Sequence, residues 1–158
     1  VVVTGGKGLI GSRLTTVSKT DCLYYVRKLE PTPYITKEEN AGPMYMNGRE
    51  GFKTAVLSSS FDIKRLLDKA GLKPTDIKYY LLHQANMRII EAIANQLQLD
   101  MSYFPHNVDY CGNTSSASVA LLLDELHRAG KLQRGDKLIL SAFGAGFTTG
   151  TCLIEWTK

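Results

Sequence analysis

Cysteine is scarce and irregularly spaced in this sequence. The three cysteines, Cys22, Cys111 and Cys152, lie far apart among 158 residues and form no C-x-x-C pair. An odd number of cysteines without metal-ligand spacing argues against a disulfide framework and against a zinc site. We therefore expect a reducing compartment and a cytoplasmic protein without a bound metal.

Long apolar runs and concentrated charge are missing as well. No apolar stretch approaches the length that spans a bilayer, and no basic segment leads into an apolar one at the start. The net charge is +4, but the 19 Lys and Arg residues are scattered, whereas a protein that binds nucleic acid usually carries a basic stripe. The sequence thus predicts partners that are neither membranes nor nucleic acids.

What remains is the composition of an ordinary folded domain. Hydrophobic residues make up 44% and charged residues 22%, which is close to the average of globular proteins. A chain of 158 residues buries about two-thirds of its unfolded surface in one core. Because the chain begins on Val-Val-Val and not on Met, we expect it to be part of a longer polypeptide.

The spacing of apolar residues predicts alternating strands and helices. We expect helices at residues 49–70, 87–99 and 115–132, and strands at residues 1–3, 12–17, 77–82, 104–110, 137–143 and 148–156, with a loop at 29–48. Helices between apolar strands indicate a layered α/β domain with a largely parallel sheet. The last two strands are predicted to pair antiparallel, because only the short segment FGAGF joins them.

The glycines of the opening segment VVVTGGKGLIGSRL match a dinucleotide fingerprint. Gly6, Gly8 and Gly11 fit G-x-G-x-x-G, and Glu30 lies at about the distance of the acidic residue that binds the ribose. The helix that this motif requires would be residues 13–20, which are too few and too β-branched to pack across a sheet. We therefore favour a hairpin here and keep an NAD-binding oxidoreductase as an alternative.

Polar residues that can do chemistry follow two of the predicted strands. His83 and Asn86 lie in LLHQANMR, and Asn113 lies in CGNTSSAS, where the carboxyl ends of parallel strands bind ligands. A neutral imidazole and a carboxamide can each donate one N–H to the same carbonyl oxygen, which makes an oxyanion hole. The small residues of FGAGF, residues 143–147, would let a third donor from the backbone approach.

Each of these residues has a simpler alternative. His83 could be a buried histidine satisfied by the backbone, Asn113 could cap a helix, and FGAGF could be a plain hairpin. Cys111 could be a nucleophile activated by His83, although small buried cysteines far outnumber catalytic ones. Two further histidines, His106 and His127, have no partner at metal-ligand spacing. Two acidic residues, Asp124 and Glu125, fit a solvated helix face.

Three segments of the sequence resemble one enzyme family. LLHQANMRIIEAIANQL, NVDYCGNTSSASVALLLDELHRAGKLQRGDKLIL and SAFGAGFTTG are similar to the C-terminal half of β-ketoacyl-acyl-carrier-protein synthase III. The resemblance implies a thiolase-like layered α/β fold, here its C-terminal half with a mixed five-stranded-type sheet and packed helices. It implies that residues 1–43 are the last strand pair of the preceding half plus a connecting loop, and that residues 44–158 are the C-terminal half-domain.

The resemblance also implies a decarboxylative condensation by a Cys–His–Asn triad. The Cys takes an acyl group from acyl-CoA, usually acetyl-CoA, while His83 and Asn113 hold the carbonyl of malonyl-acyl carrier protein. No cysteine of this chain matches the nucleophile, which is expected in an N-terminal half outside the chain. A cytoplasmic homodimer of fatty-acid synthesis without a cofactor is implied, and a non-catalytic partner subunit of the same fold is an alternative.

Further site residues are assigned by the same resemblance. It implies an oxyanion position in the glycine-rich loop, at Gly144, Ala145 and Gly146. The implied substrate-binding residues are Gly48 and Phe52, which line the pantetheine tunnel, Phe143, and Asn86, which also supports the active-site hydrogen bonds. Arg88 is implied to dock the carrier protein. Two positions depart from the family pattern. Thr149 stands where Trp is usual, and Gly51 replaces a larger apolar residue.

Overall fold

The computed structural model describes residues 8–19, 21–25, 33 and 43–158. Its main sheet has the strand order β1–β6–β5–β4, and its strands are β1 (Leu9–Thr16), β4 (Tyr79–Leu82), β5 (Lys137–Gly144) and β6 (Thr148–Glu155). β4 and β5 are parallel, whereas β6 runs antiparallel to both β5 and β1. The predicted mixed sheet and its antiparallel last pair are confirmed.

Two details of the predicted sheet differ from the structure. The largely parallel sheet is wrong for the described chain, because the turn after β5 reverses the direction and β1 adds a second antiparallel pairing. The described residues also contribute four strands to this sheet and not five. The predicted strand at residues 1–3 lies outside the residues that the structure describes.

The opening glycine motif does not form a cofactor turn in the described residues. Gly11 lies inside β1 opposite Leu153, next to a bulge that begins at Leu9. A Cβ at Gly11 would lie 3.1 Å from Cδ1 of Leu66, so this glycine lets a helix approach the strand closely. Because the strand continues to Thr16, the helix of a dinucleotide-binding motif is absent there.

The three long helices are confirmed, at α1 (Gly48–Ala70), α2 (Met87–Leu97) and α4 (Ser118–Arg128). Local signals set the ends of α1. The side chain of Asn47 accepts a hydrogen bond from the Glu50 N–H at its start, and Gly71 ends it in the left-handed conformation with φ 66°. These signals are readable in the sequence, so the predicted range was accurate to about one residue.

The predicted strand at residues 104–110 is wrong. Its second part forms α3 (Val108–Cys111), and single turns flank it at η2 (Met101–Tyr103) and η3 (Ser115–Ala117); a similar turn, η1 (Pro74–Asp76), precedes β4. The buried carboxamide of Gln84 explains the difference. Its Oε1 accepts the backbone N–H of Asn107 at 3.0 Å and of Val108 at 3.2 Å, so these donors cannot join a sheet.

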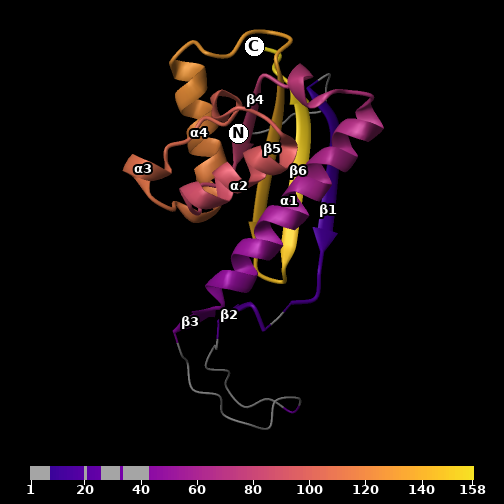
Figure 1. Ribbon diagram of the computed structural model, residues 1–158. Coiled ribbons are helices and arrows are strands. Elements are labelled where there is room, and N and C mark those ends of the chain that lie inside the picture. The colour runs from indigo at the N-terminus through magenta and orange to yellow at the C-terminus, as the bar shows by residue number, and fades with distance from the viewer. Residues whose placement is uncertain (1–7, 20, 26–32, 34–42) are drawn as a thin grey trace.

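The helices cover the two faces of the sheet unequally. α1 and α2 pack on one face, and α4 packs on the other against β4 and β5 (Figure 1). The core under α1 and α2 includes Ile63, Leu67, Ile90, Ile139 and Leu153, and the smaller core under α4 includes Leu81, Leu122, Leu126 and Leu138. Two layers of helices around one sheet confirm the predicted layered α/β class.

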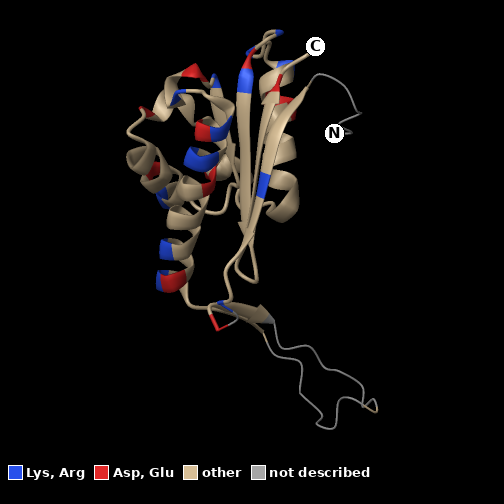
Figure 2. Ribbon diagram, turned by 90° about the vertical axis from the view of Figure 1, so that its right-hand side faces the viewer, with Lys and Arg blue, Asp and Glu red and all other residues tan. Residues whose placement is uncertain are grey.

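A small hairpin projects from one end of this body. It consists of β2 (Leu23–Tyr25) and β3 (Met44–Met46), where the rings of Tyr24 and Tyr45 stack at 4.9 Å between centroids. Figure 2 shows this hairpin beyond the lower end of the sheet, and basic and acidic residues are interspersed over the helices. Among the described helices, none combines the length and the apolar run that crossing a bilayer requires.

Gly51 lies in the first turns of α1 beside the buried Cys22, and a Cβ at Gly51 would lie 3.7 Å from the Cys22 Sγ, an ordinary contact. We therefore expect Gly51→Ala to raise the free energy of unfolding by about 0.5–1 kcal/mol, because alanine loses less backbone entropy in a helix. Urea unfolding followed by the fluorescence of Trp156, the single tryptophan, measures this. Gly71→Ala is the control and should lose about 1 kcal/mol, since its φ is +66°. A loss in Gly51→Ala would contradict the prediction.

Candidate functional site

His83 follows β4 directly and is held from three directions. Its backbone N–H donates to the Ser141 carbonyl oxygen on β5 at 2.8 Å. Its Nδ1 lies 2.7 Å from the Ser118 Oγ on α4. Its ring meets the Phe143 ring edge-on, with centroids 5.2 Å apart and planes at 69°. The imidazole therefore has a fixed orientation at the carboxyl end of two parallel strands.

Burial lowers the pKa of His83 below its usual value. The side chain is nevertheless only partly buried. The alternative of a histidine satisfied by the backbone is not supported, because a hydroxyl and not a carbonyl meets Nδ1. A neutral imidazole in this place can donate one N–H to a substrate oxygen.

Asn113 lies in the turn between α3 and α4, after Gly112, which has φ 68°. Its Oδ1 accepts the backbone N–H of Ser115 at 2.9 Å. The capping alternative is not confirmed in that form, because the N-cap of η3 is Thr114 and that of α4 is Ala117, and Asn113 only closes a local turn before them. Because Oδ1 faces the backbone, the amide nitrogen points away, and within residues 43–158 it has no hydrogen-bond acceptor. The contact of Oδ1 with Ser115 therefore leaves both N–H groups of the Asn113 side-chain amide available to a ligand.

Ser118 connects the segments of His83 and Asn113. The turn that Asn113 closes runs through η3 into α4, whose first residue is Ser118, and Ser118 contacts the His83 ring. Only four residues therefore lie between Asn113 and Ser118, which contacts His83. Two motifs that are 30 residues apart in sequence come to one end of the sheet, and their convergence on one oxygen stays a prediction.

The glycine-rich segment forms the turn between β5 and β6, so the hairpin alternative is confirmed. Gly146 has φ 134°, and a Cβ there would lie 2.7 Å from the Thr148 Oγ1, which leaves room for glycine alone. Val17 and Phe147 exchange two backbone hydrogen bonds at 2.8 and 2.7 Å. Gly144 ends β5, and Ala145 is exposed, so the turn is held at its base and open at its tip.

The start of α1 lies at the same end of the molecule as this turn (Figure 1). Lys19 joins them, because its backbone N–H donates to the Gly146 carbonyl at 3.0 Å and its Nζ pairs with the Glu50 Oε2 at 3.1 Å. Lys19 thereby lowers the pKa of Glu50. A Cβ at Gly48 would meet open space, and Phe52 is 39% exposed. Neither residue contacts His83 in the described structure.

Asn86 and Arg88 lie at the start of α2. Asn86 is the N-cap, and its Oδ1 accepts the backbone N–H of Arg88 at 2.9 Å. Both side chains are exposed. The structure thus gives Asn86 a capping contact, and it leaves the Arg88 guanidinium on the surface next to the site.

The sequence interpretation missed the roles of Gln84 and Glu125. Gln84 is fully buried and holds the segment before α3, as described above. Glu125, assigned to a solvated helix face, is partly buried: its carboxylate accepts from the Asn107 Nδ2 at 3.1 Å and from the Tyr110 hydroxyl at 2.8 Å. This contact raises the pKa of Tyr110 to about 12. Asp124 is exposed as predicted and pairs with Arg128.

The other candidates separate from the site. Cys111 is exposed, and its Sγ lies 4.0 Å from the Glu125 Oε1, so the described residues form no thiol–imidazole pair. His106 contacts the Phe104 carbonyl at 3.3 Å, and His127 lies 5.3 Å from the Trp156 ring. No group of metal-ligating side chains occurs among the residues that the structure describes.

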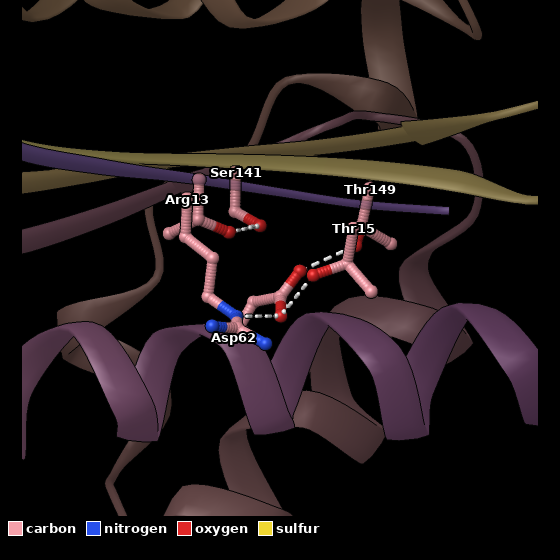
Figure 3. A network of polar contacts seen from close by, with 6 residues as sticks. Arg13, Thr15, Asp62, Ser141 and Thr149 are labelled. Atoms are coloured by element: carbon pink, nitrogen blue, oxygen red, sulfur yellow. Dashed lines mark hydrogen bonds and ion pairs between the residues drawn. The ribbon is translucent and has the colours of Figure 1, made fainter. Parts of the chain in front are cut away.

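A buried carboxylate lies under α1, away from these residues. Asp62 is fully buried and accepts from the Arg13 Nε at 2.6 Å, from the Thr15 Oγ1 at 2.8 Å and from the Thr149 Oγ1 (Figure 3). Beside it, the hydroxyls of Ser141 and Thr151 lie 2.9 Å apart. Thr149, the departure from the family pattern, therefore ties β6 to α1 through a hydrogen bond.

Comparison with known proteins identifies the family of this chain. Residues 67–156 match the model of the 3-oxoacyl-[acyl-carrier-protein] synthase III C terminal. The chain is 41% identical over 133 residues to the β-ketoacyl-[acyl-carrier-protein] synthase III of Helicobacter pylori strain 26695, covering 84% of this chain and 40% of the relative. It is 38% identical to the enzyme of that name from Caldanaerobacter subterraneus, covering 99% of this chain and 48% of the relative.

A solved structure shows the same arrangement in space. The synthase III of Thermus thermophilus superposes with a TM-score of 0.83 at 38% identity, over 98% of this chain and 48% of that one. The chain therefore spans less than half the length of the relatives that it matches. The match begins within α1 and includes both HQAN and GNTS.

Proposed function

Because the chain belongs to the β-ketoacyl-acyl-carrier-protein synthase III family, as its C-terminal part, we propose that it completes an enzyme that condenses acyl-CoA with malonyl-acyl carrier protein. Acetyl-CoA is the expected primer. The supporting observation is His83, a partly buried imidazole fixed at the end of β4 beside the segment of Asn113. The fold is that of condensing enzymes of fatty-acid synthesis.

In this proposal His83 and Asn113 act on the malonyl thioester. The bond from the α-carbon to the carboxylate breaks, CO2 leaves, and the electron pair passes into an enolate whose charge lies on the thioester oxygen. An N–H from each side chain donates to that oxygen, which lowers the barrier because the charge develops in the transition state. A neutral His83 suits this role. Because burial lowers its pKa, the ring favours the neutral form, whose one remaining N–H can donate to the oxygen.

The carbanion then attacks the acyl group held by the nucleophile. A carbon–carbon bond forms, the acyl carbonyl oxygen becomes negative, and collapse of this intermediate expels the cysteine thiolate. We assign the backbone N–H of Ala145, between Gly144 and Gly146, to that second oxygen. The firm base of this turn, bonded to Val17 and Lys19, supports the assignment because an oxyanion donor must hold its place.

The substrates would approach along the end of the molecule that carries the start of α1. Gly48 and Phe52 line the pantetheine path in this proposal, and their open surroundings suit a chain that passes over them. Asn86 supports the start of α2, and Phe143 keeps the His83 ring upright against the substrate. Arg88, exposed and two residues after Asn86, would meet the acidic carrier protein.

The nucleophile belongs to an N-terminal half in this proposal. Leu14, on the face of β1 turned away from α1, is 81% exposed, and Leu121 on α4 is 42% exposed, so the α4 side of the sheet has apolar surface for that half to cover. Assembly of the completed enzyme as a cytoplasmic homodimer is part of the same proposal, and sedimentation of that enzyme tests its dimeric state.

We expect this chain alone to form no 3-ketoacyl product and the chain joined to an N-terminal half with the nucleophile to form it. Radiolabelled acetyl-CoA and malonyl-acyl carrier protein are the substrates, and product and CO2 are counted together. Calorimetry with NADH is the second measurement, and no saturable binding is expected. Failure of the joined enzyme to release CO2 would refute the condensation, and saturable NADH binding would favour the oxidoreductase. Malonyl thioester binding without turnover would favour a non-catalytic subunit.

A further inference from the structure

Ser118 holds an unusual pair of hydrogen-bond partners. It is the first residue of α4, and only 1% of its surface is exposed. Its Oγ lies 2.7 Å from the His83 Nδ1 and 3.3 Å from the backbone nitrogen of Gln84. No other partner of this hydroxyl occurs in residues 43–158 of the structure. The two contacts together decide where the protons lie.

The Gln84 backbone N–H can only donate, so the Ser118 Oγ is the acceptor in that contact. The hydroxyl has one proton of its own, and a buried hydroxyl proton without an acceptor costs free energy. The His83 Nδ1 is the acceptor within reach. Nδ1 must then be unprotonated, and the proton of the neutral ring lies on Nε2.

The opposite tautomer, with the proton on Nδ1, leaves more hydrogen-bonding groups unpaired. If Nδ1 carried the proton, it would donate to the Ser118 Oγ, which would then accept twice and leave its own proton unpaired. The surroundings do not favour a charged ring either. The groups against the imidazole are Ser118 from α4, Phe143 from β5 and the Gln84 backbone, and no charged side chain of the described structure contacts it.

We propose that Ser118 is a positioning residue for the condensation, which donates its hydroxyl proton to Nδ1 of His83 and so fixes the tautomer with its proton on Nε2. That nitrogen then faces the thioester oxygen as a donor at all times, without a second tautomer in which it would repel the oxygen. Phe143 fixes the plane of the ring, and Ser118 fixes its proton. This inference rests on the proposed function of His83.

The test uses Ser118→Ala in the complete enzyme, with Ser118→Thr as the conservative variant and Ser141→Ala as the matched control. Ser141 is also a buried serine with a hydroxyl partner, Thr151, and its carbonyl keeps the His83 backbone contact. We expect Ser118→Ala to lower kcat for decarboxylation about 10- to 100-fold with little change in KM. Ser118→Thr should recover most of the rate, and Ser141→Ala should match the wild type.

Two readouts separate positioning from a loss of packing. A hydroxyl that donates to Nδ1 favours the neutral ring, so its removal raises the pKa of His83, and the acid limb of the rate profile should move to higher pH in Ser118→Ala. Nitrogen-15 spectra of histidine-labelled enzyme should show the wild-type Nδ1 unprotonated. A protonated Nδ1, an unmoved acid limb or a kcat equal to that of Ser141→Ala would each overturn the proposal.

The outcome is distinguishable from a failure of the proposed function. If the complete wild-type enzyme decarboxylates malonyl thioester while its Nδ1 carries a proton, the role of Ser118 is refuted and the function stands. If the wild type decarboxylates nothing, the function is refuted, and the role of Ser118 in the reaction falls with it. The spectrum is recorded without substrate, so it reports the tautomer in both cases.

Discussion

Replacement of His83 or Asn113 with alanine should lower malonyl decarboxylation by the complete enzyme about 10²- to 10³-fold each, because each change removes one donor from the oxygen that becomes negative. Acyl transfer from acyl-CoA to the nucleophile should continue, since neither side chain is assigned to that step. Release of labelled CO2 from malonyl-acyl carrier protein measures the first effect, and mass spectrometry of the acylated enzyme measures the second.

Matched controls exist for both residues. His127→Ala removes an exposed imidazole that lies against Trp156 and not at the site. Asp100→Ala removes a side-chain contact of the same geometry as that of Asn113, because the Asp100 Oδ1 accepts the Ser102 N–H two residues on, as the Asn113 Oδ1 accepts the Ser115 N–H. Both should decarboxylate at the wild-type rate. The double variant at His83 and Asn113 should raise the activation free energy by less than the sum of the two single effects, because the effects of residues that act on one atom are not additive. Normal decarboxylation in both single variants would contradict the assigned roles.

The sequence predicted the place of His83 in the fold, but it did not predict the contacts that hold this side chain. His83 follows the predicted strand β4, which the structure confirms, whereas Asn113 was placed by the strand predicted at residues 104–110, which is wrong. Ser118 is one serine in the run TSSAS. Nothing in that run distinguishes it until β4 and α4 bring its hydroxyl to the imidazole. Supporting contacts of this kind depend on tertiary packing, which a periodic pattern does not encode.

The same contrast between local signals and tertiary contacts explains which elements of the fold were predicted correctly. α1 was predicted because its periodicity runs over 23 residues and caps mark both ends. The segment 104–110 was assigned to a strand from its apolar and aromatic residues, but the Gln84 carboxamide, about 20 residues earlier, takes its backbone donors. A side chain that binds backbone groups can override a local preference for strand. Pairing of β1 with β6 is likewise set by contacts across most of the chain.

The two departures from the family pattern each have a local partner. Gly51 leaves space beside α1 that the buried Cys22 fills. At Thr149, where the resemblance predicts a Trp, the hydroxyl donates to Asp62. A small residue at each position therefore comes with a compensating neighbour, and neither departure leaves the core unfilled or unpaired around it. The Asp62 cluster consequently becomes the polar tie between α1 and the sheet.

This tie makes Arg13 a sensitive position for stability. Arg13→Ala should lower the free energy of unfolding by about 3 kcal/mol, because removing one partner leaves a buried charge without compensation. Asp62 is fully buried, whereas the Arg13 side chain is 38% exposed. The loss of stability therefore comes mainly from the carboxylate, which loses its counter-charge in the interior. Urea unfolding of the chain, followed by Trp156 fluorescence, gives the change from the transition midpoint.

Arg65→Ala is the matched control, because the Arg65 guanidinium stacks on the Phe61 ring at 5.6 Å as Arg13 does at 5.4 Å, yet it forms no ion pair within the described residues. Its effect should stay within about 0.5 kcal/mol. Adding Asp62→Asn to Arg13→Ala should restore part of the lost stability, since the amide removes the uncompensated charge. Its oxygen can accept from one of the two hydroxyls, Thr15 or Thr149, and its NH2 group can donate to the other. If the double variant were no more stable than Arg13→Ala, the charge would not be the cause, and the loss would have to come from packing of the arginine stem on Phe61.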